Sequence, residues 1–486
     1  MSIISPNLYS QWRARNIGIH TLQETSDPPL PTERLLQLVW HYQRLLRDQL
    51  QTLDGQTLRV LHPGFWNHEA GPDFRDAIIQ IGSAPAQRGD VEIDLRPGGW
   101  RSHGHEANPA YQKVVLHAVW DGEGKSSCVL PTLAFKPFLD APLSELNGWL
   151  GRVPEELAAS LKGQCCSPLA DLPPSLFLEI LDQAAEIRLQ AKATQLQARA
   201  RQIGWEQSLW EGLFGALGYK NNIWPMRRIA ELLPALGSKP GEPESVFELE
   251  AQLLGLSGLL PEELTRLRPS VDAYLRRVWD AWWRQRERYS DLILPRALWR
   301  LNGLRPANHP QRRLALAAHW LSAGDLLVKL ENWFLAPLDD NALLNSLLAA
   351  LQVNADDFWS WHWTFRSAKM AKPQPLLGPQ RATDLAVNVI LPWFWMRAVA
   401  GKNESLRQIA EHRYFSWPKA EDNSVLRLAR QRLFGGKNIR SLKTAAAQQG
   451  LLQIVRDFCD HSNALCESCR FPEFVRQLQP ASALSL

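Results

Sequence analysis

Carboxylate side chains in the first 100 residues stand at positions from which they could bind a divalent cation. The stretch GPDFRDAIIQIG (71–82) places Asp73 shortly before the apolar run 77–81, which is typical of a buried strand. The stretch GDVEID (89–94) contains Glu92 and Asp94, which lie two residues apart and would therefore point to the same face of a strand. A carboxylate at Asp73 could cap its strand or bind a metal.

Asp73 and Glu92 would lie side by side if their strands were antiparallel neighbours joined by the short connection SAPAQR (83–88). Converging carboxylates repel one another unless a cation or a proton lies between them. Oxygen ligands of this kind suit Mg²⁺ or Mn²⁺, which keep several water ligands and contact substrate phosphates. We therefore predict a metal site with Asp73 and Glu92 as ligands, and with Glu33 as an outer ligand or an orienting group.

These residues fall in a segment that alternates between helix and strand. Residues 31–50 carry apolar side chains along one helical face, and Pro31-Thr32-Glu33 is a typical helix start. Strands are predicted within 54–64, at 77–81, 89–99, 114–120 and 128–138, with one helical turn at 108–113. The order is helix, three strands, short helix and two strands, which predicts an α/β domain over residues 30–145.

Three histidines lie in GGWRSHGHEANPAYQKVVLH (98–117), directly after the predicted strand that carries Glu92. His103 and His105 could bind the metal or contact phosphate, or they could belong to a polar loop that closes the strand; the sequence favours neither role. For His117 the sequence favours a structural role, in which a backbone carbonyl holds the ring.

The α/β segment resembles the PD-(D/E)XK nuclease superfamily, whose core is an α-β-β-β-α-β unit. That superfamily has a proline-aspartate at the second strand and a Glu-x-Lys on the third. Pro72-Asp73 and Glu92-Ile93-Asp94 occupy the corresponding places, and Glu33 matches the acidic residue that such nucleases often carry on the first helix. The resemblance implies a restriction-endonuclease-like fold in which Asp73 and Glu92 hold a metal that activates water.

Asp94 stands where the motif has its lysine. Loss of one preorganised electrostatic group commonly lowers the rate of an enzyme by about 10²–10³-fold. Lys113 or one of the nearby histidines could replace the lysine, as migrated residues do in some members of the superfamily. Without such a replacement, the domain would bind its ligand and not cleave it.

Over nearly its full length, the sequence resembles the bacterial domain-of-unknown-function family 2851 (DUF2851). EAGPDFRDAIIQI, GDVEID and AYQKVVLHAVW match the N-terminal pattern of this family. LGYKNN (217–222), RPANHPQRRLA (305–315), NVILP (388–392) and CDHSNALCESC (459–469) match its later landmarks in order. Members usually carry a histidine where Asp94 stands, and membership implies no activity, so the nuclease hypothesis depends on the residues above.

The rest of the chain predicts a connector at 146–172 and a large all-α domain at 173–458. With 486 residues, the chain is long enough for two or three domains. Several of its 21 tryptophans cluster in stretches such as VWDAWWRQRERY (278–289) and DFWSWHWTF (357–365). We expect these rings to fill helix–helix contacts rather than to stack on bases. For Arg305, Arg312 and Arg313, structural contacts are favoured over phosphate binding.

The C-terminal stretch CDHSNALCESC (459–469) predicts a metal-binding staple over residues 459–470. A C-x-x-C pair directs two thiolates to one tetrahedral Zn²⁺ centre, here Cys466 and Cys469 with Cys459 as the third ligand. His461 or one of the pair Cys165 and Cys166 would complete the set, and a contribution from Cys166 would also allow an iron–sulfur cluster. Some nucleases of the RecB type carry such a staple. The alternative is a group of free buried cysteines.

Charge and hydropathy restrict the function only weakly. The net charge of +4 neither requires nor excludes a nucleic-acid partner. No long apolar segment suggests a secretion signal or a membrane span, so we expect a cytoplasmic protein without a membrane partner. The leading hypothesis is metal-dependent hydrolysis of phosphodiester bonds in DNA or RNA. The alternatives are a catalytically inactive module that binds nucleic acid or protein, and an enzyme that hydrolyses another phosphate ester.

Overall fold

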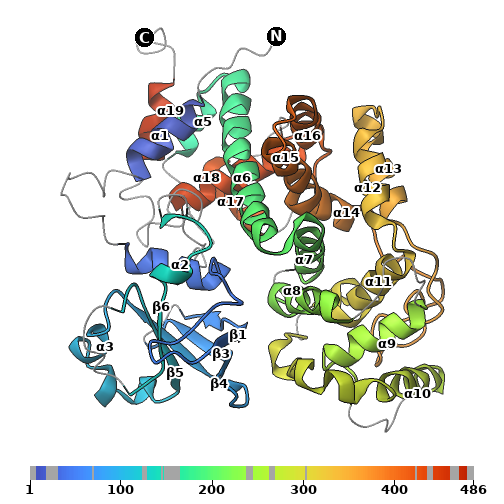
Figure 1. Cartoon of the computed structure of the whole chain (residues 1–486). Helices are drawn as coiled ribbons and strands as arrows, with labels where there is room; N and C mark the ends of the chain where they lie inside the picture. Colours follow the sequence, from blue (N-terminus) through green and yellow to red (C-terminus); the bar gives the residue numbers. More distant parts are fainter. Residues whose placement is uncertain are drawn as a thin grey trace, which may run out of the picture. The chain divides into compact units, whose positions relative to one another are not determined.

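The computed structural model of the chain divides it into two compact units, made from residues 1–191 with 421–486 and from residues 192–420 (Figure 1). It describes residues 7–17, 31–67, 71–122, 129–143, 146, 165–219, 221–236, 245–261, 269–301, 304–421, 424–434, 442–459 and 470–478. The division differs from the predicted domain boundaries. It falls inside one long helix rather than at the connector 146–172, and the C-terminal helices belong to the first unit.

A mixed β-sheet forms the N-terminal part of the first unit. Its strands lie in the order β1-β3-β4-β5-β6, and the short β2 pairs with β3. Strand β3 pairs antiparallel with both β1 and β4. Strand β5 pairs parallel with both β4 and β6. The bounds are β1 Leu58–His62, β2 Phe65–Trp66, β3 Phe74–Ile81, β4 Gln87–Asp94, β5 Val114–Val119 and β6 Thr132–Ala134. The five predicted strands are all present, with shifted ends.

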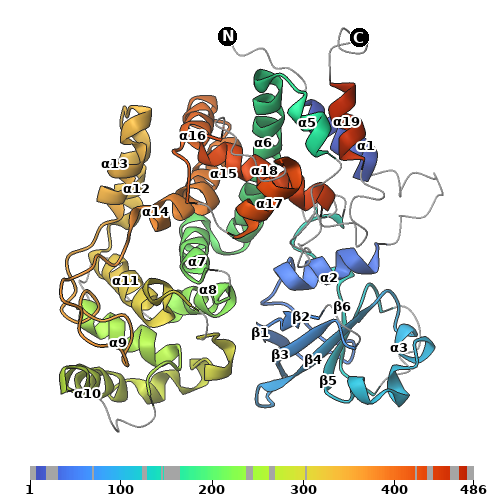
Figure 2. The ribbon, with the colours of Figure 1, turned by 180° about the vertical axis from the view of Figure 1, so that it is seen from behind.

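Helix α2 (Glu33–Tyr42) packs against the sheet and is seen along one side of it in both views (Figures 1 and 2). The side chain of Thr32 accepts a hydrogen bond from the backbone N–H of Leu35, which fixes the start of the helix. Gln43 adopts a left-handed conformation and ends it. The buried face of α2, which includes Leu36 and Trp40, packs with strand residues in one apolar core. This packing places Glu33 near the sheet.

The crossover between the parallel strands β4 and β5 consists of short helical turns. These are α3 (Gly99–Ser102), η1 (His105–Ala107) and η2 (Pro109–Tyr111). Asn108 accepts a hydrogen bond from the backbone N–H of Ala110 and so starts the last turn. Because both strands run in the same direction, the chain must return along the sheet, and this return carries three of the aromatic and histidine side chains of the site.

A second apolar core in the first unit is formed mainly by helices. It joins residues of α1, the start of α6 and the C-terminal helices. Helix α1 was not predicted; the hydroxyl of its residue Tyr9 donates a hydrogen bond to Asp457 across 448 positions of sequence. The bounds are α1 Leu8–Ile17, α5 Cys166–Ala170, α6 Pro174–Ile203, α17 Ser424–Phe434, α18 Ala445–Ile454, η10 Val455–Cys459 and α19 Phe471–Gln477.

Among its described residues, the second unit consists of helices and the loops that connect them. Buried tryptophans such as Trp282, Trp359 and Trp393 fill its interior, as predicted, whereas Trp283 is exposed. No helix among the described residues is long and apolar enough to cross a membrane. The helices with at least seven residues are α7 Trp205–Leu217, α8 Ile223–Leu232, α9 Val246–Leu256, α10 Pro269–Trp283, α11 Pro310–Ala323, α12 Leu326–Leu335, α13 Leu343–Leu351, α14 Pro379–Leu385, α15 Leu391–Ala400 and α16 Glu404–Ser416, with η5 at Arg286–Leu292.

The arginines of RPANHPQRRLA serve the fold of this second unit. Arg312 and Arg313 are buried, and their guanidinium groups donate hydrogen bonds to backbone carbonyls of the segment between α13 and α14. The structural role predicted for these two residues is therefore confirmed. Arg305 is exposed.

His309, in the same motif, should make the stability of the protein depend on pH. Burial, and to a smaller degree the charge of Arg296, lowers the pKa of His309 from 6.5 to about 4. The unfolded chain then takes up a proton before the folded one does, so stability falls as the pH drops from about 6.5 towards 4. Compared with His309→Asn, the wild type should lose about 2 kcal/mol between pH 7.5 and pH 5. Urea unfolding at several pH values measures this, and equal pH slopes for both proteins would contradict it.

Candidate functional site

A cluster of titratable side chains lies where the end of β4, the start of β3, helix α2 and the crossover meet. Six of its members were predicted from the sequence: Glu33, Asp73, Glu92, Asp94, His103 and His105. The other members are Gln37, Tyr111 and His117. All of them belong to the first unit, and every one lies among the described residues.

Asp73 both caps the sheet and faces a second carboxylate. Its Oδ2 accepts a hydrogen bond from the backbone N–H of Ile93 (3.0 Å), and its Oδ1 accepts one from the side-chain amide of Gln37 (2.8 Å). The backbone N–H of Asp73 donates to Oε2 of Glu92 at 3.1 Å. The antiparallel pairing of β3 with β4 therefore brings Asp73 and Glu92 together, which is the arrangement that the sequence predicted.

Three carboxylates of the cluster, Glu33, Asp73 and Glu92, resist ionisation. Burial raises the pKa of Asp73 and of Glu92, and the negative charges around each of them raise it further. The pKa of Glu33 is raised by burial and by Asp94, while His103 opposes this rise. Such a group of acids keeps a proton at neutral pH unless a cation replaces it.

Two histidines hold Asp94. Its Oδ2 lies 2.9 Å from Nε2 of His117, and its Oδ1 lies 3.1 Å from Nδ1 of His103. The prediction for His117 was wrong in its partner, because the ring contacts a carboxylate and not a backbone carbonyl. His103 is half exposed, whereas Asp94 is buried. A Cβ atom on Gly99 would lie 2.5 Å from Oδ1 of Asp94, so glycine at that position leaves room for the carboxylate.

His105 packs among aromatic side chains of the crossover. Its ring stacks on Tyr111 with 3.9 Å between centroids, and Trp100 contacts both rings edge-on. Its Nε2 lies 3.2 Å from Oε1 of Glu92 but without the alignment of a hydrogen bond. Burial lowers the pKa of His105, although the charge of Asp94 opposes this effect. The ring is therefore neutral at pH 7, the form in which imidazole binds metals.

The donor set fits a metal ion. Asp94, His103 and His105 each offer one ligand atom, and these three atoms lie within 4.8 Å of one another. The sequence had pointed instead to Asp73 and Glu92 as ligands of Mg²⁺ or Mn²⁺. Imidazole ligands favour Zn²⁺ and similar transition metals, and carboxylates favour Mn²⁺ over softer ions. The mixed set suits Zn²⁺ or Mn²⁺ better than Mg²⁺.

Lys113 does not take the place of the lysine that Asp94 replaces. Its side chain is exposed, and within the described parts of the chain it makes no hydrogen bond or ion pair. Its backbone carbonyl accepts a hydrogen bond from the N–H of Asp90, four residues before Asp94 on β4. The histidines, and not Lys113, therefore contact the position that the motif gives to lysine.

Gln37 was missed by the sequence reasoning. It stands one helical turn after Glu33, and its side-chain amide lies within 3.4 Å of Oε1 of Glu33 and 2.8 Å from Oδ1 of Asp73. The signal that could have identified it is the spacing of four residues from Glu33 on a helix, which puts both side chains on one face.

The predicted cysteine staple falls mostly outside the described residues. Outside the described residues lie Cys466, Cys469, His461 and the side chain of Cys459. Cys165 is buried in the helical core of the first unit, and Cys166 is half-buried at the start of α5. The metal staple therefore stays a prediction.

One comparison with known proteins gives a match. A family model described as "Protein of unknown function (DUF2851)" matches residues 33–424. No curated protein and no solved structure matches the chain. The matched region contains all members of the cluster, from Glu33 to His117, together with the second unit.

Proposed function

We propose that this chain, which belongs to the DUF2851 family, hydrolyses phosphodiester bonds of DNA or RNA with a divalent metal bound beside the end of β4. The observation that carries the proposal is the convergence of four carboxylates and three histidines on one end of the sheet, with a metal-capable trio at Asp94, His103 and His105. Acids and imidazoles gathered this closely, with perturbed pKa values, are typical of functional sites.

The topology supports the same reaction class. The order of α2, three antiparallel strands, a helical crossover and a parallel strand is the order that the resemblance to PD-(D/E)XK nucleases calls for. Asp73 directly before β3 and Glu92 on β4 stand at the positions of the two acidic residues in that motif. This is support by analogy, and the side chains themselves must carry the chemistry.

Asp94, His103 and His105 would hold the ion, with Glu92 beside His105 as the next acidic group. When bound, the ion would supply charge stabilisation at the phosphoryl oxygens and a water of lowered pKa. Asp73 orients Glu92 through its backbone N–H, and the amide of Gln37 in turn holds Asp73. Each of these contacts fixes a side chain before substrate arrives.

Two further features suit an anionic substrate. Arg96 and Arg101 flank the turn at Gly98 and Gly99, and both side chains are exposed without a partner among the described residues. His103, with a side chain that is 54% exposed, is the member of the metal-binding trio most open to solvent. A phosphate that approached the trio would meet these groups first.

One observation favours a second candidate, a module that binds nucleic acid without cleaving it. Asp94 occupies the lysine position of the motif and already has two histidine partners, and Lys113 does not replace the lysine. In that case, the cluster, with or without a bound metal, would only stabilise the surface that binds nucleic acid.

A cleavage assay separates the two candidates. Full-length protein, freed of metal with EDTA, should cut labelled single- or double-stranded DNA or RNA only after Mn²⁺ or Zn²⁺ is added. His103→Gln removes an exposed imidazole from the trio and should lower the rate by about 10²-fold or more. Its small effect on packing should leave the circular dichroism spectrum unchanged.

Asp76→Asn is the matched control, because Asp76 is an exposed carboxylate on β3 that pairs with Arg88 outside the cluster. It should cleave like the wild type. Metal-independent cutting, or equal rates for His103→Gln and the control, would reject the proposed site. Metal-dependent binding of nucleic acid without cleavage would favour the binding module.

A further inference from the structure

The second unit contains another group of metal-capable side chains, far in sequence from the first. Glu250 on α9, His319 on α11 and Asp356 after α13 each offer one ligand atom, and these atoms lie within 4.8 Å of one another. Glu250 and Asp356 are buried, and His319 is partly buried. The family landmarks noted in the sequence include none of the three.

Asp356 is fixed in a charged form. Its Oδ1 accepts hydrogen bonds from the backbone N–H groups of Phe358 (2.8 Å) and Trp359, and its Oδ2 lies 3.0 Å from Nε2 of His319. Burial opposes ionisation of Asp356, but these hydrogen bonds, above all the one with His319, outweigh it and lower the pKa to about 2. These hydrogen bonds favour the anionic form of Asp356 and hold its carboxylate in one orientation.

Glu250 places a second carboxylate beside Asp356. One oxygen of the Glu250 carboxylate has no hydrogen-bond partner. Oε2 accepts a hydrogen bond from the hydroxyl of Tyr274 (2.7 Å), whereas Oε1 is buried with no hydrogen-bond partner. The residue is only 2% exposed. A buried carboxylate oxygen without a donor is costly, and more so beside another carboxylate, so a cation or a proton is needed there.

The charges around Glu250 and Asp356 leave the cluster negative. Asp357 adds a third carboxylate nearby. Arg312 is the cation that acts on Asp356, but its N–H groups are directed at backbone carbonyls. Neither group supplies a donor to Oε1 of Glu250.

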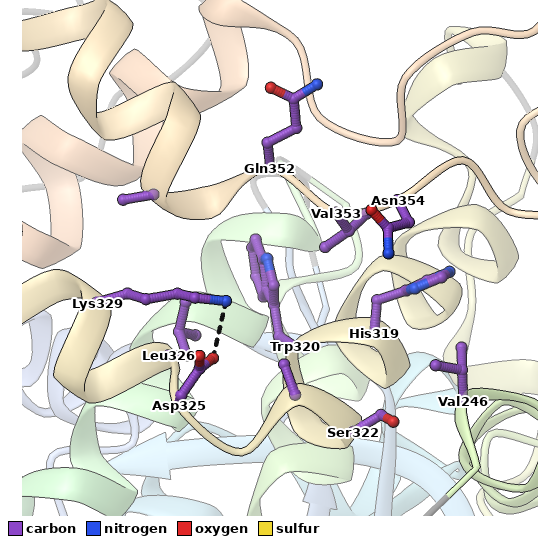
Figure 3. A pocket seen from close by; sticks show the side chains of 12 residues that line it. Val246, His319, Trp320, Ser322, Asp325, Leu326, Lys329, Gln352, Val353 and Asn354 are labelled. Carbon is purple, nitrogen blue, oxygen red and sulfur yellow. Dashed lines mark ion pairs between the residues drawn. The ribbon is translucent and has the colours of Figure 1, made fainter.

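A pocket borders the cluster at His319, which is one of the residues that line it. Its volume is about 300 Å³, and it is lined by His319, Trp320, Ser322, Lys329, Gln352 and Asn354 among others (Figure 3). Lys329 forms an ion pair with Asp325 at 2.9 Å, so its charge is already matched. The pocket gives an ion and its remaining water ligands a route to His319.

We propose that Glu250, His319 and Asp356 bind a divalent transition-metal ion, with Zn²⁺ as the probe. Two carboxylate oxygens and an imidazole nitrogen form a donor set that Zn²⁺ accepts and that Mg²⁺ and Ca²⁺, which prefer oxygen alone, fit poorly. The ion occupies the space beside Oε1 of Glu250 and links α9 and α11 to the segment that follows α13. This proposal does not depend on the function proposed for the first unit.

The competing state is a proton shared by Glu250 and Asp356, and a metal count distinguishes the two. Full-length wild type, Glu250→Gln and His319→Gln are each dialysed against Zn²⁺, and bound zinc is counted per chain. The wild type should hold one equivalent more than either variant, whatever other sites the chain has. Removing a ligand should weaken this site by more than about 100-fold, since changes behind a ligand already cost about 10–100-fold.

Glu248→Gln is the control on the same helix, because the side chain of Glu248 is 44% exposed and lies outside the cluster. It should keep the wild-type count and the rise in melting temperature that Zn²⁺ gives the wild type. Equal counts for wild type and Glu250→Gln would overturn the proposal and favour the shared proton. If Glu250→Gln does not fold, His319→Gln decides, and a wild type that takes up no Zn²⁺ overturns the proposal without any variant.

Discussion

Glu92→Gln should lower the rate of metal-dependent cleavage by about 10²–10³-fold and leave the fold intact. Glutamine keeps the shape of the side chain, and its amide oxygen can still accept the hydrogen bond from the N–H of Asp73. The charge that the proposed metal site needs beside His105 is lost. Single-turnover cleavage under saturating Mn²⁺ would measure the change in the chemical step.

The same substitution should make the protein more stable, and increasingly so as the pH rises. Burial and the neighbouring Asp73 raise the pKa of Glu92 above its ordinary 4.5 in the folded state. A raised folded pKa means that stability is fully present below about 4.5 and is lost as the pH rises towards the raised value. Glutamine carries no such charge, so urea unfolding in EDTA should show a stability difference that grows from pH 5 to pH 8.

Glu106→Gln is the matched control for both measurements, since Glu106 is an exposed carboxylate next to His105. It should change neither the cleavage rate nor the pH dependence of stability. A Glu92→Gln protein that is as active as the wild type would remove Glu92 from the reaction. One that is inactive but also less stable would show that the cluster serves the fold.

A gain of stability with a loss of activity is the expected signature of a functional cluster. The fold could place apolar side chains at Asp73, Glu92 and Asp94 and avoid the repulsion between them. Proteins keep such destabilising groups mainly where the chemistry needs them. The two carboxylates of the second cluster, Glu250 and Asp356, would also repel each other. A bound ion or a shared proton would relieve this repulsion.

The sheet and much of the first cluster could be predicted because their signals are local. Alternating side chains define β4, and the short connection after β3 implies antiparallel pairing, which sets Asp73 beside Glu92. The contact of His117 with Asp94 depends on the parallel register of β4 and β5. A crossover of about twenty residues does not specify that register, so this contact could not be predicted from the sequence.

The division into units could not be predicted for a related reason. Periodicity shows where helices occur, but the partner of each helix depends on contacts between distant segments. Tyr9 pairs with Asp457, and a Cβ on Gly450 of α18 would lie 2.0 Å from the carbonyl oxygen of Leu181 on α6. These close contacts hold the C-terminal helices in the first unit, and no local sequence pattern predicts them.

Arg312→Met should lower the free energy of unfolding by about 3–4 kcal/mol. Arg312 is 1% exposed and donates hydrogen bonds to the carbonyls of Trp359, His362, Gln374 and Pro375. Methionine fills similar space but offers no donor, so carbonyls of the segment between α13 and α14 lose their partners. Hydrogen bonds to a charged donor are worth more than neutral ones, which makes the loss large. Urea unfolding monitored by tryptophan fluorescence measures it.

Arg366→Met tests whether this effect comes from the buried position, because Arg366 is an exposed arginine of the same segment whose guanidinium has no partner among the described residues. It should change stability by less than about 0.5 kcal/mol. Since Asp356 lies in the segment that Arg312 anchors, Arg312→Met should also weaken the uptake of Zn²⁺ at Glu250, His319 and Asp356. A stable Arg312→Met protein would mean that the carbonyls find water instead, and the segment would then owe its shape to its buried aromatic rings.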